Sequence, residues 1–258
     1  MFPSIFVSHG SPSLMIENNK TTNFLKSLPL MFYKPEYILV ISAHWITRNL
    51  EILTKSESSV IYDFYNFPKE LYEQEYPANS DPKKEDEIIE LLQNNSISIR
   101  KNSNRVGYDH GVWSPLSFMY PDADIPIIQL SLPMSYTTEE LINLGRVLYP
   151  LRKDTLILSS GSLTHNLNLL EFGNPNAKVH DYAKVFHDWL IDKLENGKKE
   201  DILKYQTRAP CLSQNHPTIE HFSPLLVSYG ASKDNIGRSL HDEYMYGNLS
   251  MDTIIFNN

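Results

Sequence analysis

The sequence predicts one α/β domain spanning residues 1–258, in which helices flank a central, mostly parallel mixed β-sheet and the chain ends in a β-hairpin. Two observations predict this class. Continuous apolar runs rich in β-branched residues, typical of strands buried on both faces, alternate with segments of helical periodicity. No internal repeat, low-complexity stretch or linker composition divides the 258 residues, a length that suits one large domain.

Four buried strands are expected, and three of them lead into small polar residues and a histidine. The apolar runs cover residues 5–7, 37–41, 124–132 and 155–160. Histidines follow the first, second and fourth runs, at His9, His44 and His165. In open α/β sheets, ligands bind just beyond the carboxyl ends of parallel strands. If these three strands are parallel neighbours, their imidazoles meet at one edge of the sheet.

Helices are expected between and after the strands. They cover residues 21–32, a segment begun by Asp81 and Pro82, residues 137–151, residues 179–194 and a segment that starts at Pro217. Asp81 is a good N-cap, and Thr137 with Glu140 forms a capping box. His180 and His187 fall on other faces than the apolar one of their helix, and we expect both at the surface.

Three other segments have weaker signals. Ile97 and Ile99 alternate with polar neighbours and predict a short strand. Residues 107–115 are expected to form a loop, because glycines flank His110 and make it poorly suited to a core. Residues 239–256 predict an antiparallel hairpin.

Residues 62–82 are aromatic and punctuated by prolines, which is too apolar for a linker. The pattern fits a lid or pocket wall, with Tyr62 and Phe64 as candidate substrate contacts, and it fits equally a loop packed on the core. His241, in the C-terminal hairpin, either has a structural role or reaches the same pocket.

Composition excludes several classes of function. A net charge of −8 without an offsetting basic stretch argues against nucleic-acid binding. No apolar run approaches the roughly 20 residues of a membrane span, and the N-terminus lacks the basic region of a secretory signal. One cysteine, Cys211, allows no disulfide within the chain. We therefore expect a cytoplasmic protein, as a monomer or small homo-oligomer.

Five histidines lie beside small residues or prolines at the ends of expected elements, and they are the strongest chemical signal. They are His9, His44, His110, His165 and His221. Neutral imidazole is a common ligand of transition metals, and three or four could hold Zn²⁺ or Fe²⁺. No spacing matches a local metal motif such as H-E-x-x-H, so each histidine could instead be a core residue bonded to a carbonyl. Phosphate-binding glycine loops and the G-x-S-x-G nucleophile motif are absent.

A set of motifs, in order along the chain, resembles one known family. The motifs are SHGSP at 8–12, SAHW at 42–45, YDF at 62–64 with FP at 67–68, DHGVW at 109–113, GSLTHN at 161–166, HPTIEH at 216–221 and YMYG at 244–247. Together they resemble the class III extradiol ring-cleavage dioxygenases, and most of all the 4,5-DOPA dioxygenase-like group. Any one motif alone would be a weak signal.

The resemblance implies one divalent metal, Fe²⁺ for catalysis and Zn²⁺ in the isolated protein. His9 and His44 correspond to metal ligands of the family. The third ligand falls within HPTIEH, where we favour His221 and keep Glu220 as the alternative. His165 corresponds to the catalytic base and could also be a fourth ligand to zinc.

The resemblance also implies the reaction. His110 corresponds to the histidine that contacts substrate or bound oxygen, and the substrates would be O₂ and a small, DOPA-like catechol. The alternative is a non-catalytic zinc-binding or protein-interaction module of the same fold. His165 and His110 favour the enzyme, because a binding module does not require a base.

Overall fold

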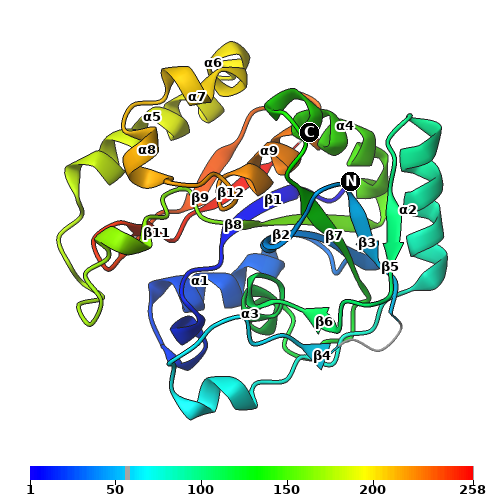
Figure 1. Ribbon diagram of the computed structural model, residues 1–258, viewed down its shortest axis with the longest axis horizontal. Coiled ribbons are helices and arrows are strands. Elements are labelled where there is room, and N and C mark those ends of the chain that lie inside the picture. The colour runs from blue at the N-terminus through cyan, green and yellow to red at the C-terminus, as the bar shows by residue number, and fades with distance from the viewer. Residues whose placement is uncertain (56–58, 258) are drawn as a thin grey trace.

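The computed structural model describes residues 1–55 and 59–257, and a mixed sheet crosses its centre (Figure 1). Among the described residues this sheet has eight strands, in the order β5-β3-β7-β2-β8-β1-β12-β9. The strands are β1 Ser4–Ser8, β2 Tyr37–Thr47, β3 Glu51–Leu53, β5 Arg100–Asn102, β7 Ile127–Pro133, β8 Thr155–Gly161, β9 Arg238–His241 and β12 Thr253–Phe256. The four central strands β7, β2, β8 and β1 are mutually parallel, whereas β12 is antiparallel to β1 and β9 to β12. The predicted fold class is confirmed.

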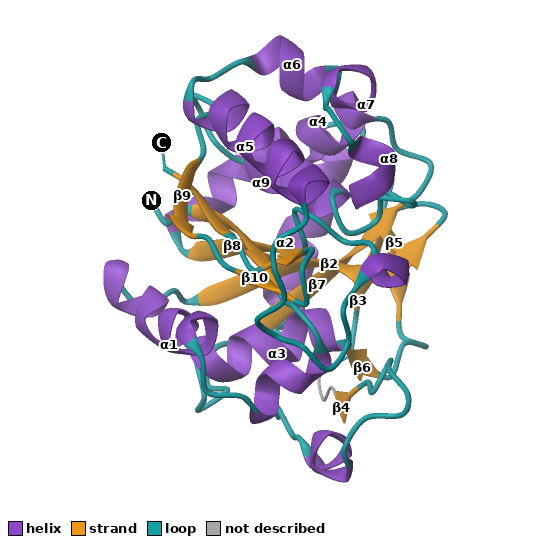
Figure 2. Cartoon of the chain, turned by 90° about the vertical axis from the view of Figure 1, so that its left-hand side faces the viewer, coloured by secondary structure: helices purple, strands orange, loops and turns teal. Residues whose placement is uncertain are grey.

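Helices cover both faces of the sheet (Figure 2). The α-helices are α1 Lys20–Ser27, α2 Pro82–Asn94, α3 His110–Met119, α4 Thr138–Leu148, α5 Asp181–Glu195, α6 Lys199–Leu203, α7 Tyr205–Arg208, α8 Leu212–Asn215 and α9 Ser223–Gly230. The 3₁₀ helices are η1 Pro12–Ile16, η2 Leu28–Met31, η3 Lys69–Glu73, η4 Tyr149–Lys153 and η5 Leu167–Leu169. Helices α2, α4, α5 and α9 pack on one face, and α1 and α3 on the other. None of the helices within the described ranges is both long and apolar enough to cross a bilayer.

The central strand β2 explains why a continuous apolar run is needed. Leu39 and Ile41 pack in the core under α4 and α9, whereas Ile38 and Val40 pack in the core over α1 and α3. Alternate side chains of a strand point to opposite faces, so a strand covered on both faces must be apolar throughout.

The helix starts follow the predicted caps. The Asp81 side chain accepts the backbone N–H groups of Lys83 and Lys84 at the start of α2. Thr137 and Glu140 form the reciprocal capping box of α4. At the C-terminus, β10 (Tyr244–Met245) and β11 (Leu249–Ser250) form a short hairpin, and β4 (Ser59–Val60) pairs with β6 (Gly107–Tyr108).

Two local predictions between residues 97 and 115 were wrong. The strand expected at Ile97 and Ile99 begins only at Arg100. Residues 107–115 are not a loop, because most of them form β6 and the start of α3. Most of the nearly continuous apolar run that follows His110 is buried in the helix, and this burial outweighs the low helix propensity of Gly111 and the internal proline.

The helix expected at Pro217 is also absent. Residues 217–222 form turns, and the helix begins at Ser223, with Pro224 in its first turn. Both prolines suit a helix start, but the run that follows Pro224, including Leu225 and Val227, is fully buried against the sheet.

His187 is 7% exposed, so the prediction of a surface residue was wrong for it. Its Nε2 lies 2.7 Å from Oδ1 of Asp252, and its Nδ1 lies 3.3 Å from Asp188. Burial alone would lower the pKa of His187, but these carboxylates outweigh burial and raise it above the usual value. His180 is half-buried and bonds Glu171.

Arg152 joins the two ends of the chain in the interior. Its guanidinium donates hydrogen bonds to the carbonyl oxygens of Phe2 at 2.6 Å, Ala231 at 2.8 Å and Phe256 at 3.2 Å. The side chain is fully buried, so its donors must find these carbonyls inside the protein.

We expect Arg152→Met to lower the free energy of unfolding by about 3 kcal/mol or more, because three buried carbonyls would lose their donors. Urea titration measures this loss. The matched variant Arg146→Met, on the exposed side of α4, should change stability by less than about 0.5 kcal/mol. A loss of unfolding free energy below about 1 kcal/mol for Arg152→Met would contradict the stabilising role of these three hydrogen bonds.

We expect the contribution of His187 to stability to decline at alkaline pH. Its pKa in the folded protein is raised above the unfolded value of about 6.5, so its contribution is complete below that pH and is lost as the pH rises through the folded-state pKa. Unfolding free energies at about pH 6 and about pH 9 test this. The difference in unfolding free energy between wild type and His187→Gln should be smaller at the higher pH. An unchanged or larger difference would disprove the stabilising role of the raised pKa.

Candidate metal centre

Two central strands and the loop after a third deliver histidines to one edge of the sheet. Strands β1 and β2 both pair in parallel with β8, which lies between them, and their ends are level, with Ser8 opposite Gly161 and Ser42 opposite Ser160. His9 directly follows β1, and His165 lies on the loop after β8. The rings of His9 and His44 are 4.8 Å apart between centroids.

His44 does not lie at a strand end, as the sequence predicted, but inside β2. Pairing with β8 nevertheless stops at Ser42, and pairing with β7 shifts register between Ile41 and Ile46. His44 therefore sits in an irregular stretch where the strand leaves its neighbour, and its side chain can turn towards the edge.

Two more histidines reach the same edge from helix starts. His110 is the first residue of α3, and His221 precedes α9. Gly161 makes the approach of His221 possible, since a Cβ at this position would lie 2.1 Å from the carbonyl oxygen of His221. The ring of His221 is 4.9 Å from that of His44 and stacks on His165 at 3.5 Å.

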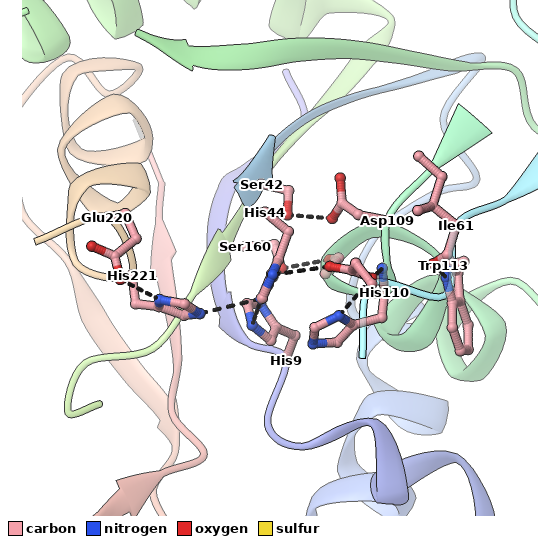
Figure 3. A network of polar contacts seen from close by, with 12 residues as sticks. His9, Ser42, His44, Ile61, Asp109, His110, Trp113, Ser160, Glu220 and His221 are labelled. Atoms are coloured by element: carbon pink, nitrogen blue, oxygen red, sulfur yellow. Dashed lines mark hydrogen bonds and ion pairs between the residues drawn. The ribbon is translucent and has the colours of Figure 1, made fainter. Parts of the chain in front are cut away.

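Three imidazole nitrogens lie very close together (Figure 3). Nε2 of His44 is 3.0 Å from Nε2 of His9 and 3.2 Å from Nε2 of His221. Two nitrogens bound to one tetrahedral zinc ion, each about 2.0–2.1 Å from it, lie about 3.3 Å apart.

Carboxylates determine the tautomers of two of these rings. Nδ1 of His44 lies 3.0 Å from Oδ2 of Asp63, and Nδ1 of His221 lies 3.2 Å from Oε1 of Glu220. An ionised carboxylate can only accept, so each Nδ1 carries the proton and each Nε2 keeps a lone pair. Glu220 therefore stands behind His221 as an orienting group.

A different chain of bonds has the same effect on His9. Pro115 lacks an N–H, so the carbonyl of Gly111, four residues earlier, has no partner inside helix α3. That carbonyl accepts the hydroxyl proton of Ser160. The Ser160 oxygen, 2.8 Å from Nδ1 of His9, must therefore accept the proton of Nδ1.

The lone pairs of His9 and His221 thus both face that of His44, with no proton between them. Such an arrangement is repulsive unless a cation lies among the lone pairs. A neutral imidazole whose second nitrogen donates a hydrogen bond to an oxygen is also the usual form of a metal-binding histidine. The residues present therefore fit a divalent metal ion. Ligand atoms of two sets of side chains lie within 4.8 Å of one another, His9 with His44 and His110, and His165 with Glu220 and His221.

Burial keeps the imidazoles of His9 and His221 neutral. It lowers the pKa of His9 well below its usual value, and His44 lowers it further. Burial also lowers the pKa of His221 to about 4, although Glu220 opposes this shift. Neutral rings are the form that binds a metal.

The two carboxylates behave in the opposite way. Burial alone would raise the pKa of Asp63, but the contacts with His110 and His44 hold it well below its usual value. Burial likewise opposes ionisation of Glu220, yet the bond from His221 lowers its pKa to about 2. Two negative charges therefore stand behind neutral imidazoles and balance the charge of a divalent cation.

His165 differs from the three converging histidines. No side chain in the described ranges holds either of its ring nitrogens by a hydrogen bond, and the loop that carries it is fixed through its backbone. The backbone N–H of His165 donates to the carbonyl oxygen of Asn215, and Nε2 of His216 donates to the carbonyl oxygen of Leu163. Burial lowers the pKa of His165 to about 2, and His221 contributes to the shift. Its nitrogens are free to exchange a proton or to bind a ligand.

A cavity of about 280 Å³ opens over the histidines. Its residues are His9, Gly10, Ser11, Pro12, His44, Asp63, Phe64, Tyr65, Phe67, His110, His165, Leu167, Leu170, Phe172, His221, Tyr246 and Leu249. The walls are mainly apolar and aromatic, and the volume is near the lower limit for ligand pockets, about 300 Å³. The aromatic stretch after residue 62 therefore forms part of a pocket wall.

Two predicted substrate contacts lie elsewhere. The Tyr62 hydroxyl donates to the carbonyl of Gln74, and its ring packs behind Phe64, which does line the cavity. His241 is not a lining residue, because its Nε2 bonds Thr21 and its ring stacks on Phe24.

Other residues of the site could not be assigned from the sequence. Asp63 lies in the YDF motif, and a lone carboxylate in an aromatic stretch was the available signal. Ser160 ends the run 155–160 and Gly111 lies in the DHGVW motif, but neither had a predicted role. Leu167 and Phe172 follow the His165 motif and carried no signal, because only the fold of their loop brings them over the cavity.

Comparisons with known proteins agree with this geometry. The family model of the catalytic LigB subunit of aromatic ring-opening dioxygenase matches residues 3–253. A Beta vulgaris protein named 4,5-DOPA dioxygenase extradiol is 37% identical over 260 residues, which cover 98% of this chain and 96% of that protein. An Escherichia coli K12 protein of the same name is 34% identical and covers 89% of this chain and 84% of its own length.

A solved structure has the same fold. The crystal structure of an uncharacterized protein from Escherichia coli K12 superposes with a TM-score of 0.84 at 27% identity, covering 100% of both chains. The family match and the relatives above 30% identity both extend over most of the chain. The chain therefore belongs to the LigB family of extradiol ring-cleaving dioxygenases.

Proposed function

We propose that this protein uses Fe²⁺ to open the ring of a small, DOPA-like catechol with O₂, beside the diol. The ligands we assign to the metal are Nε2 of His9, His44 and His221, with Glu220 outside the ligand set. The observation that carries the proposal is the convergence of these three lone pairs at 3.0 and 3.2 Å. The names of the Beta vulgaris and Escherichia coli relatives support a catechol of the DOPA type.

The cavity supports a single-ring substrate. Its volume of about 280 Å³ leaves room for one aromatic ring with a short substituent. Phe64 and Phe67 contact each other edge to face and line one wall, where they can pack on a bound ring and exclude water. In this proposal Tyr62 supports Phe64 from behind, and His241 has no contact with substrate.

Two histidines provide the remaining chemistry. We assign His165 the role of the base that takes a hydroxyl proton from the catechol, since no side chain in the described ranges holds its ring nitrogens, and the negative charge of the catecholate formed beside it would oppose the lowering of its pKa by burial. His110 lines the cavity and contacts the substrate. When bound, Fe²⁺ supplies Lewis acidity towards the catechol oxygens and the redox chemistry that lets O₂ react with them.

A zinc-loaded, non-catalytic module is the competing function. Zn²⁺ prefers four ligands, and His165, stacked on His221, is the candidate for the fourth. We favour the enzyme because the cavity has an aromatic wall and a histidine with free nitrogens. We also propose a cytoplasmic location, consistent with the single free cysteine, Cys211.

We expect the protein, reconstituted with Fe²⁺ without oxygen and then mixed with a catechol in air, to consume O₂ and form a yellow ring-opened product. A panel that includes DOPA, dopamine and 4-methylcatechol, followed by absorbance and an oxygen electrode, measures this. His9→Ala should remove both metal and activity. If no catechol is consumed while His9→Ala still abolishes metal binding, the module is the correct function.

We expect His165→Ala to bind metal as tightly as wild type, within about 3-fold, and to lose at least about 100-fold in kcat, the range for loss of a general base. Competition with a chelator and steady-state kinetics measure the two quantities. His180→Ala, which removes a histidine bonded to Glu171, is the matched control and should change neither. Loss of metal from His165→Ala would instead make His165 a ligand.

A further inference from the structure

One carboxylate, Asp63, contacts two histidines that have different positions in the site. Its Oδ1 accepts the backbone N–H of His110 at 3.0 Å and lies 2.9 Å from Nδ1 of the same residue. Its Oδ2 lies 3.0 Å from Nδ1 of His44, a close charge contact that does not have the geometry of a hydrogen bond. Asp63 belongs to the aromatic segment that walls the cavity, directly before Phe64.

The contact with Asp63 determines which nitrogen of His110 carries the proton. The carboxylate can only accept, so Nδ1 of neutral His110 is the donor and Nε2 keeps its lone pair. The backbone N–H of His110, at the N-terminus of α3, binds the same oxygen and fixes the ring relative to the carboxylate. Rotation of the ring would break the Nδ1 bond.

The free nitrogen of His110 faces the site. His110 is a lining residue of the cavity, and in Figure 3 its ring nitrogen without a dashed line points towards His9. Phe64 contacts the ring of His110 edge to face at 5.9 Å and limits its movement on the other side. A neutral His110 in this position cannot donate a hydrogen bond into the cavity.

We propose that Asp63 makes His110 a hydrogen-bond acceptor for a hydroxyl group of the substrate. This assignment rests on the proposed function, since it requires a ligand with a hydroxyl group beside the metal. A catechol offers two such groups, and Nε2 of His110 receives one of them. His110 is thus a substrate-orienting residue, and Asp63 is a positioning residue that acts on both His110 and the metal ligand His44.

The two cavity histidines then differ in a physical way. His110 has a fixed tautomer because Asp63 holds its Nδ1, whereas no carboxylate in the described part of the chain forms a hydrogen bond with a ring nitrogen of His165, which stacks on His221. A fixed acceptor orients a hydroxyl, and a ring without fixed partners can exchange a proton. His110, which contacts a carboxylate, therefore binds the substrate, and His165, which does not, transfers the proton.

The tautomer is measured directly in the full chain loaded with Zn²⁺ and labelled with ¹⁵N-histidine. A long-range ¹H–¹⁵N correlation spectrum separates Nδ1–H from Nε2–H rings, and the His110→Ala spectrum assigns the signal. We expect His110 in wild type to be Nδ1–H. A proton on Nε2 in wild type would overturn the proposal whatever the fate of any variant.

Substitutions of Asp63 separate its two contacts. Asp63→Asn keeps one oxygen, which can accept both bonds from His110, but turns an NH₂ group towards His44. It should keep the His110 tautomer and weaken Zn²⁺ binding by about 10- to 100-fold. Asp63→Ala should also let His110 populate both tautomers. Glu220→Gln, which changes the carboxylate behind His221, is the control and should leave the His110 signal unchanged.

Binding of catechol to the Zn²⁺-loaded protein tests the acceptor role without turnover. His110→Ala should weaken catechol binding by about 10-fold, the loss expected for one hydrogen bond, and keep Zn²⁺ affinity within about 3-fold. Unchanged catechol affinity would overturn the acceptor role, and loss of Zn²⁺ would make His110 a metal ligand. These outcomes are distinct from failure of the proposed function, in which the tautomer is as expected but no catechol is opened with Fe²⁺.

Discussion

Repulsion between three imidazole lone pairs is the interaction around which this site is built. Nε2 of His44 lies 3.0 Å from Nε2 of His9 and 3.2 Å from Nε2 of His221. An oxygen atom lies beside Nδ1 of each ring. Those oxygens prevent the rings from moving the proton to the centre, so the fold maintains an arrangement that a cation relieves. Burial adds to the effect by keeping His9 and His221 neutral, while Asp63 and Glu220 remain ionised.

Two residues near the site, a proline in helix α3 and a glycine in strand β8, are unfavourable for their own helix or strand but help to build the site. Pro115 interrupts the hydrogen bonds of α3, and the carbonyl of Gly111 that it releases binds Ser160, which in turn determines the tautomer of His9. Gly161 weakens β8 locally but lets the backbone of His221 approach. Local rules of helix and strand formation are violated at positions where the site needs a free carbonyl or a close contact.

Much of the fold could be predicted from the sequence, because its signals are local. The apolar run through Leu39 and Ile41 predicted a strand buried on both faces, and Thr137 with Glu140 predicted a helix start. Prediction was wrong where tertiary burial overrode local preference. Most apolar side chains that follow Gly111 are buried in a helix despite this glycine, and His187 is buried because Asp252, 65 residues away, provides its partner.

The sequence by itself determined the four buried central strands, the order of the motifs and the histidines that follow β1 and β8, since each depends on residues close together in the chain. Only the tertiary structure decided which nitrogen of each ring faces the centre. It also placed Tyr62 behind Phe64 and kept His241 away from the cavity. Proton positions depend on hydrogen bonds between residues such as His9 and Ser160, 151 positions apart, and no local pattern encodes a contact of that range.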